Sequence, residues 1–245
     1  VTFARIAALT GAREAVIHKE FHLSSADPKI VGTGKARKIG QTDYDVADQL
    51  SNLGMEAVHP SAAKILRQAG IPLRVADAFD VEDPGTLILS DVEAAPRVDM
   101  VTGLVVAALS VHEPDMVGVK GYDAAILHAL TQNDVWIVSK ASNANTITHY
   151  VDPQLKVLRA VERAVEARYE KAEIDIRKIA LVSAVGRGLL DICVPSRGLQ
   201  ALAEAGIESL GVHAIARGVD VQFLVPENRL NDAITAIHEA LVEAA

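Results

Sequence analysis

An internal repeat constrains the fold of this 245-residue sequence more than any other feature. From residue 101 onward, one order of elements occurs twice: strand, turn, helix, strand, strand, helix. The first copy has strand-like runs at 101–111, 135–139 and 146–151 and helical patterns at 122–130 and 154–169. The second has strand-like runs at 178–185, 208–215 and 219–225 and helical patterns at 197–205 and 231–242. The repeat predicts two small α+β modules, each a sheet with helices on one face.

The first ninety residues have a different organisation. Strand-like and helix-like stretches alternate there, which favours an α/β layer architecture. The stretch from residue 77 to residue 96 contains two prolines and six acidic residues, as expected of a linker. We therefore expect three parts, at residues 1–93, 94–172 and 173–245, with room for strand exchange or insertion between the last two.

Composition narrows the functional class. Thirty-two acidic residues against 24 basic ones give a formal charge of −8, which argues against nucleic-acid binding because phosphate contacts need a basic face. No apolar run approaches the roughly 20 residues of a membrane helix, and residues 1–14 do not resemble a signal peptide. The single cysteine, Cys193, excludes an internal disulfide and is interpreted as a packed thiol in a reducing, cytoplasmic protein. The only tryptophan, Trp136, lies in an apolar run and is predicted to be in the core.

Two histidines raise the question of a metal. His18 and His22 have the i, i+4 spacing that would place both rings on one face of a helix, as in a zinc hydrolase. However, the metalloprotease order has glutamate directly after the first histidine, whereas Glu20 comes third here, and Val16-Ile17 indicates a strand running into a loop. We therefore expect two loop histidines and no metal site.

Two glycine-containing turns could bind anions. A cluster of basic residues lies near glycines in an otherwise acidic chain: Lys29, Lys35, Arg37 and Lys38. These residues could contact a polyphosphate, or they could form a solvated loop. The turn from Gly118 to Asp123 precedes a helix, whose free N–H groups suit a small carboxylate, although an ordinary helix cap has the same pattern.

Four short segments, taken in order, resemble the aspartate kinases. They are Asp27-Pro28-Lys29, the run from Gly54 to His59-Pro60, Ile71-Pro72-Leu73-Arg74-Val75 and Pro84-Gly85-Thr86-Leu87-Ile88. The tandem repeat then matches the two regulatory ACT domains of that family. The resemblance implies the C-terminal part of an α/β/α amino-acid kinase domain, followed by two α+β ACT domains of the βαββαβ-like ferredoxin type.

The function implied by the resemblance is transfer of the ATP γ-phosphoryl group to the side-chain carboxylate of L-aspartate, with Mg²⁺, giving 4-phospho-L-aspartate. By position, the nucleotide-binding residues carried over are His18, Lys19, Ser24, Lys29, Glu56 and Ala57. Glu56 and the segment from Ile17 to Pro28 depart from the usual family text and look like the subgroup associated with ectoine biosynthesis. The family's N-terminal Lys-(Phe/Tyr)-Gly-Gly-(Ser/Thr) segment is not found, so we assign no catalytic residue and expect this chain alone to be inactive.

The resemblance also implies regulation by an amino acid. The effector residues carried over are Gly121, Tyr122, Asp123, Val135, Ser142 and Asn143, for lysine, threonine or methionine. Pairing of ACT sheets implies a homodimer or a larger assembly. The alternative is a non-catalytic regulatory subunit built mainly of the ACT modules.

Overall fold

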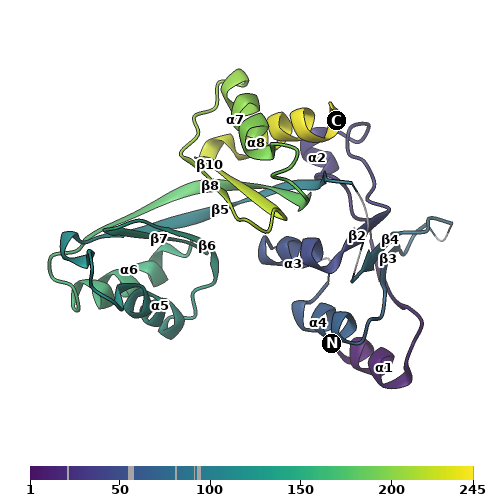
Figure 1. The fold of residues 1–245 in the computed structure, drawn as a ribbon, viewed down its shortest axis with the longest axis horizontal. Coiled ribbons are helices and arrows are strands. Elements are labelled where there is room, and N and C mark those ends of the chain that lie inside the picture. The colour runs from purple at the N-terminus through teal and green to yellow at the C-terminus, as the bar shows by residue number, and fades with distance from the viewer. Residues whose placement is uncertain (21, 55–57, 81, 91, 93–94, 245) are drawn as a thin grey trace. The chain divides into compact units, whose positions relative to one another are not determined.

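Two compact units make up the chain in the computed structural model, which describes residues 1–20, 22–54, 58–80, 82–90, 92 and 95–244 (Figure 1). Unit 1 contains residues 1–104, 182–225 and 229–245, and unit 2 contains residues 105–181 and 226–228. Two long strands, β5 (Arg97–His112) and β8 (Glu173–Arg187), contribute residues to both units. The three-part division at residues 93 and 172 stays a prediction.

The N-terminal part of unit 1 is built on a four-stranded sheet of order β1-β3-β4-β2. Its strands are β1 (Ala15–Lys19), β2 (Gln41–Asp43), β3 (Leu73–Asp77) and β4 (Thr86–Leu89). β1 is parallel to β3, β2 is parallel to β4, and β3 and β4 are antiparallel. The helices of this part are α1 (Thr2–Thr10), α2 (Pro28–Val31), α3 (Tyr44–Asn52) and α4 (Pro60–Gln68).

Local sequence explains where α3 and α4 begin. The Asp43 carboxylate accepts a hydrogen bond from the Val46 N–H at 2.9 Å and caps α3. The His59 ring nitrogen Nδ1 accepts from the Ser61 N–H at 3.1 Å, and Pro60 occupies the first turn of α4, where its missing N–H costs nothing. The His59-Pro60 pair is therefore a helix start.

The second sheet has six strands in the order β6-β7-β5-β8-β10-β9. In unit 2, β6 (Ile137–Ser142) and β7 (Thr146–Val151) form a hairpin, and β7 pairs antiparallel with β5. Helices α5 (Tyr122–Gln132) and α6 (Leu155–Glu166) pack on each other and bury Leu109, Ile126 and Leu158 with the sheet. A short 3₁₀ turn, η1 (Pro114–Met116), follows β5.

The second repeat supplies the C-terminal part of unit 1. It contains α7 (Val194–Glu204), β9 (Gly211–Ala214), β10 (Asp220–Pro226) and α8 (Leu230–His238), with a 3₁₀ turn η2 (Glu227–Arg229) and a last π-helical turn η3 (Glu239–Glu243). The element order strand, helix, strand, strand, helix thus occurs twice, as β5-α5-β6-β7-α6 and β8-α7-β9-β10-α8. This confirms the predicted mixed α/β fold with a repeated module.

Two predictions about single residues are wrong. Trp136 is 58% exposed rather than in the core; it precedes β6, and its carbonyl accepts a hydrogen bond from the Asp152 N–H. Cys193 is exposed rather than packed, since it lies in a left-handed conformation at the start of α7 (φ 55°). In both cases an apolar neighbourhood in the sequence did not indicate a buried side chain.

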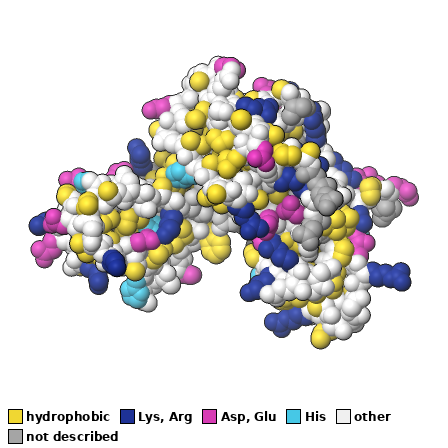
Figure 2. Space-filling model, viewed as in Figure 1, with side chains coloured by type: hydrophobic (Ala, Val, Ile, Leu, Met, Phe, Trp, Pro, Cys, Tyr) yellow, Lys and Arg dark blue, Asp and Glu magenta, His cyan; other side chains and the backbone are white. Residues whose placement is uncertain are grey.

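The face drawn in Figure 2 has no large patch of charges of one sign. Figure 2 shows Lys and Arg side chains interspersed with Asp and Glu there. No helix in the part of the chain that the structure describes is long and apolar enough to cross a membrane.

Candidate nucleotide and effector sites

The first nucleotide candidates lie at the end of strand β1. His18 and Lys19 are the last two residues of β1, opposite Ala76 and Asp77 of β3. The Lys19 carbonyl accepts from the Ala78 N–H at 2.7 Å, which extends this pairing by one residue. His18 is therefore on a strand and is exposed, so it does not share a helix face with His22. Among the described residues, no group of three or more His, Cys, Asp or Glu side chains could hold a metal ion.

Ser24 and Lys29 follow in the loop after β1 and in the short helix α2. Ser24 forms an isolated antiparallel bridge with Lys38. The Asp27 carboxylate accepts from the Lys29 N–H at 2.8 Å, which caps α2. The Lys29 side chain is exposed, and no carboxylate of the described chain pairs with its ammonium group. Glu56 and Ala57 lie outside the described residues.

The basic loop that follows α2 is held by contacts within unit 1. Lys35 pairs with Glu239, and Lys38 pairs with Asp83. The Lys38 ammonium group holds the pKa of the Asp83 carboxyl below its ordinary value. Arg37 donates from Nη2 to the Glu243 carbonyl at 3.2 Å. These cations therefore serve first to fasten the loop, an outcome that the sequence did not indicate.

A buried chain of hydrogen bonds joins this loop to the last helix. Oγ of Ser25 lies 2.8 Å from Nε2 of His238, whose Nδ1 lies 3.2 Å from a Glu243 carboxylate oxygen. Ser25 and His238 are buried, and the Ser25 hydroxyl also accepts from the Arg37 N–H at 2.9 Å. Because Ser25 bonds on both sides, its role here is to attach α8 to the loop.

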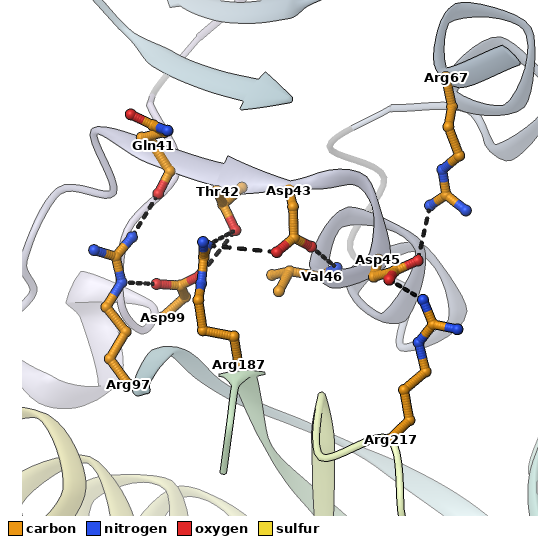
Figure 3. A network of polar contacts seen from close by, with 10 residues as sticks. All are labelled: Gln41, Thr42, Asp43, Asp45, Val46, Arg67, Arg97, Asp99, Arg187 and Arg217. Atoms are coloured by element: carbon orange, nitrogen blue, oxygen red, sulfur yellow. Dashed lines mark hydrogen bonds and ion pairs between the residues drawn. The ribbon is translucent and has the colours of Figure 1, made fainter. Parts of the chain in front are cut away.

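A charged network links β2, β5 and the end of β8 inside unit 1 (Figure 3). Arg187 lies 3.1 Å from Asp99 and 3.6 Å from Asp43 through Nη2, and the Thr42 hydroxyl donates to Asp99 at 2.8 Å. Asp99 also accepts from Arg97 Nε at 2.6 Å. Asp99 and Arg187 are almost fully buried, where water cannot solvate their charges. Each charge is therefore compensated by the other. Nothing near Arg187 in the chain indicates these partners, because Asp99 lies 88 positions away in the sequence.

The network continues along α3. Asp45 pairs with Arg217 and lies 3.3 Å from Arg67, as Figure 3 shows. The Arg67 guanidinium stands 5.6 Å from the centre of the Tyr44 ring, whose hydroxyl donates to the Ile71 carbonyl at 2.8 Å. Burial raises the pKa of Tyr44 to about 12.

The effector candidates of unit 2 gather around the start of α5. Gly121 precedes this helix with φ 100°, a conformation that glycine adopts without strain. Tyr122 stacks on Tyr169 with ring centres 4.3 Å apart. Asp123 lies in the first turn, and one of its carboxylate oxygens accepts from Lys140 at 2.6 Å. A cation from the protein itself therefore already pairs with this carboxylate.

A histidine that the sequence analysis missed lies beside Asp123. His149 of β7 is fully buried, and its Nε2 lies 3.2 Å from the other Asp123 oxygen without the alignment of a hydrogen bond. Burial lowers the pKa of His149, and the Asp123 charge offsets this only in part. The signal available in the sequence was the alternation of β7, whose inward positions include residue 149.

The remaining effector candidates lie at the two ends of β6. Val135 is half-buried just before β6, and its N–H donates to the Leu130 carbonyl at 3.1 Å. Ser142 ends β6 and is exposed. The Asn143 side chain accepts from the Asn145 and Thr146 N–H groups, which shapes the β6–β7 turn. Lys140 of β6 thus pairs with Asp123 at the start of α5, whereas the Asn143 side chain bonds within its own turn.

Known proteins resemble both parts of the chain. The amino acid kinase family model matches residues 1–77. Aspartate kinase Ask_Ect of Stutzerimonas stutzeri (strain A1501) is 48% identical over 245 residues, which covers 99% of this chain and 52% of that protein. The chain spans about half the length of the curated relatives it matches.

Solved structures agree in fold. Aspartate kinase from Clostridium acetobutylicum aligns with a TM-score of 0.86 and 21% identity over 98% of this chain and 57% of that one. E. coli aspartokinase III, solved in complex with lysine and aspartate, aligns with a TM-score of 0.82 and 17% identity over 98% of this chain and 54% of that one.

Proposed function

From the premise that this chain belongs to the aspartate kinase family, we propose that it forms the nucleotide-side and regulatory part of an aspartate kinase. The reaction is transfer of the ATP γ-phosphoryl group to the side-chain carboxylate of L-aspartate. A carboxylate needs no general base to act as the nucleophile, so catalysis depends on positioning and charge neutralisation. The observation that carries the proposal is the 48% identity over nearly the whole chain.

Within this proposal, residues 1–93 supply the nucleotide side of a kinase domain. Residues 94–172 and 173–245 are two ACT modules, and the contribution of β5 and β8 to both units supports strand exchange between them. His18, Lys19, Ser24 and Lys29 contact ATP from the end of β1 and from α2, together with Glu56 and Ala57. Mg²⁺ would accompany ATP, but the described residues offer no carboxylate cage for it, so we derive no step through it.

A non-catalytic regulatory subunit is the competing function. The match of residues 1–77 to the amino acid kinase model favours the enzyme, because a subunit of ACT modules alone has no need of that region. We also propose that the chain belongs to the ectoine-associated subgroup of the family, because its sequence departs from the usual family sequence at Glu56 and at residues 17–28.

The deciding experiment is an assay of ATP- and aspartate-dependent acyl phosphate formation, trapped with hydroxylamine. We expect none from residues 1–245 alone and activity from a longer chain that includes the Lys-(Phe/Tyr)-Gly-Gly-(Ser/Thr) segment. A longer chain that folds, contains that segment and still forms no aspartyl phosphate would favour the regulatory subunit.

Lys29 tests the nucleotide side. Its ammonium group is exposed and pairs with no carboxylate of the described residues, so it suits a phosphate oxygen. Lys29→Ala in the longer chain is therefore expected to raise the KM for ATP. Loss of one charge-assisted contact costs about 1.5–3 kcal/mol, or about a 10- to 100-fold change. Lys64→Ala, which removes an exposed lysine of α4, is the control and should leave the KM unchanged. An equal KM for ATP in both variants would mean that Lys29 is a solvated side chain that does not contact the nucleotide.

The Asp123–Lys140 pair tests the effector site. We propose that the ammonium group of lysine, threonine or methionine replaces Lys140 on the Asp123 carboxylate, near Gly121, Tyr122, Val135, Ser142 and Asn143. Asp123→Asn is then expected to weaken binding, whereas Lys140→Met removes the internal competitor and should tighten it. Calorimetric titration of each amino acid measures both changes, with Asp175→Asn on β8 as the control. Changes of the same sign in the two variants would contradict the replacement.

A further inference from the structure

Unit 1 contains a pocket lined by none of the six residues carried over for nucleotide binding, although Arg37 and Lys38 of the basic loop do line it. Its volume is about 810 Å³, within the usual range of small-molecule sites. Three segments line it: the loop after α2, the start of β5, and the C-terminal helices. We call it the Arg37/Arg197 pocket, after the two arginines discussed below.

The charged side chains of this pocket are mostly cations. Arg37, Lys38, Arg97 and Arg197 line it, with Asp99 as the acidic member. Lys38 is neutralised by Asp83, and Arg97 is paired with Asp99. Asp99 is itself shared with Arg187, so it has no charge left for a third cation.

Arg37 and Arg197 differ from the other two cations. Each guanidinium donates one Nη2 bond to a main-chain carbonyl of η3, from Arg37 to Glu243 at 3.2 Å and from Arg197 to Ala240 at 2.8 Å. Among the described residues, no carboxylate lies within ion-pair distance of either group. The Glu239 and Glu243 side chains are nearby on η3, but they pair with Lys35 and His238.

Two guanidinium groups held at one helix end repel each other, and no described carboxylate pairs with either of them. Arg37 is exposed and Arg197 is half-buried, so water screens only part of this repulsion. A guanidinium has five donors in a fork that fits a carboxylate or a phosphate, and each of these groups spends one on η3. The same helix end presents its negative dipole to the arginines, which offsets part of the repulsion. The remaining donors have no partner among the described residues.

The other lining residues are apolar. Ile39, Ile192, Leu241 and Val242 line the pocket beside the arginines, with Pro96 and Val98 at the start of β5. Such a lining favours a hydrocarbon or aromatic group over a bare ion, because burying it removes apolar surface from water. The pocket therefore combines an anion-binding end with an apolar wall.

We propose that the Arg37/Arg197 pocket binds a small organic oxyanion, whose phosphate or carboxylate group meets the two arginines and whose apolar body lies on Ile192, Leu241 and Val242. Such a ligand contacts the loop after α2, the start of β5 and the C-terminal helices together. The site shares Arg37 and Lys38 with the basic loop but contains none of the residues carried over for nucleotide or effector binding, and it does not depend on kinase activity.

Calorimetric titration of residues 1–245 with phenyl phosphate, benzoate and inorganic phosphate at constant ionic strength tests the proposal. We expect binding of phenyl phosphate or benzoate, with the stronger of the two identifying the oxyanion, and at least tenfold weaker binding of inorganic phosphate. Arg37→Ala and Arg197→Ala should each weaken binding about 10- to 100-fold, the range for a charge-assisted contact. Arg5→Ala on α1 is the matched control and should bind as the parent does.

Hydrogen–deuterium exchange on the parent chain locates the ligand without the use of variants. It therefore still tests the proposal if an arginine variant fails to fold. With phenyl phosphate or benzoate bound to the parent chain, residues 37–41 and 239–243 should exchange more slowly. The proposal is overturned if neither organic anion binds, if both arginine variants bind as the parent does, or if protection appears elsewhere. Loss of binding in Lys29→Ala with full binding in Arg197→Ala would place the anion at the nucleotide candidates and also overturn it.

Discussion

Burial places His149 in an environment that disfavours its charged form. The ring is fully buried, and the nearest charges are Asp123, which favours the imidazolium, and Lys140, which opposes it. Burial is the largest of these effects, so the pKa in the folded state lies below that in the unfolded state. The unfolded state then binds more protons, and stability is present above the unfolded pKa of about 6.5 and is lost as the pH falls.

We therefore expect the unfolding free energy of unit 2 to fall as the pH drops below about 6.5, by at most about 1.4 kcal/mol per pH unit for one proton. Trp136, the only tryptophan, lies in unit 2, so its fluorescence follows the unfolding of this unit. His149→Gln should flatten the dependence between pH 6.5 and pH 5, whereas His128→Gln, an exposed control on α5, should not. Parallel curves for the parent and His149→Gln would show that the histidine is not the titrating group.

At the scale of elements, the packing of α7 on β10 requires a glycine. A Cβ atom on Gly198 would lie 2.2 Å from Cζ of Phe223, a distance that real contacts do not reach. Phe223 is fully buried, so its ring has no open space into which to move. The helix therefore accepts a residue of low helix propensity in order to approach the sheet closely.

Gly198→Ala is expected to lower the unfolding free energy of unit 1 by about 2 kcal/mol. Overpacking costs up to about 3 kcal/mol, and the better helix propensity of alanine returns about 1 kcal/mol. Urea unfolding followed by circular dichroism measures the change, while Trp136 fluorescence should report an unaltered unit 2. Gly34→Ala, at a position with nothing within 4 Å, is the control. A stabilised Gly198→Ala would mean that helix propensity outweighs packing here.

At the scale of the whole molecule, the Arg187 network joins segments from distant parts of the sequence. Arg187 ends β8 in the second repeat, whereas Asp43 ends β2 and Asp99 is the third residue of β5. Removing one member of a buried ion pair leaves the others without compensation, which costs more than the pair itself contributes.

Arg187→Ala should therefore lower the unfolding free energy by about 3–5 kcal/mol. Arg177→Ala, on the exposed part of the same strand, should change it by less than about 1 kcal/mol. Urea titrations of the two variants under one buffer give the comparison. Similar values would show that Arg187 is solvated in solution and that the network does not stabilise unit 1.

The sequence by itself determined the elements and their repeat. β7 has the predicted bounds of residues 146 and 151, and the other predicted strands and helices of the repeat occur with shifted ends. The alternation of apolar residues and the caps at Asp43 and His59 act over a few residues, so they can be read along the chain. The same local information carried the family resemblance.

Tertiary structure alone decided the polar contacts and the exposure of single residues. Ser25 and His238 are 213 positions apart, and Arg187 and Asp99 are 88 apart, so no local pattern relates them. Trp136 and Cys193 are exposed because of where their elements begin, which hydropathy does not indicate. Asp123 was predicted to face a ligand, yet the fold brings Lys140 to it. Periodicity reports which face of an element is apolar, whereas the partner of a charge depends on which elements pack together.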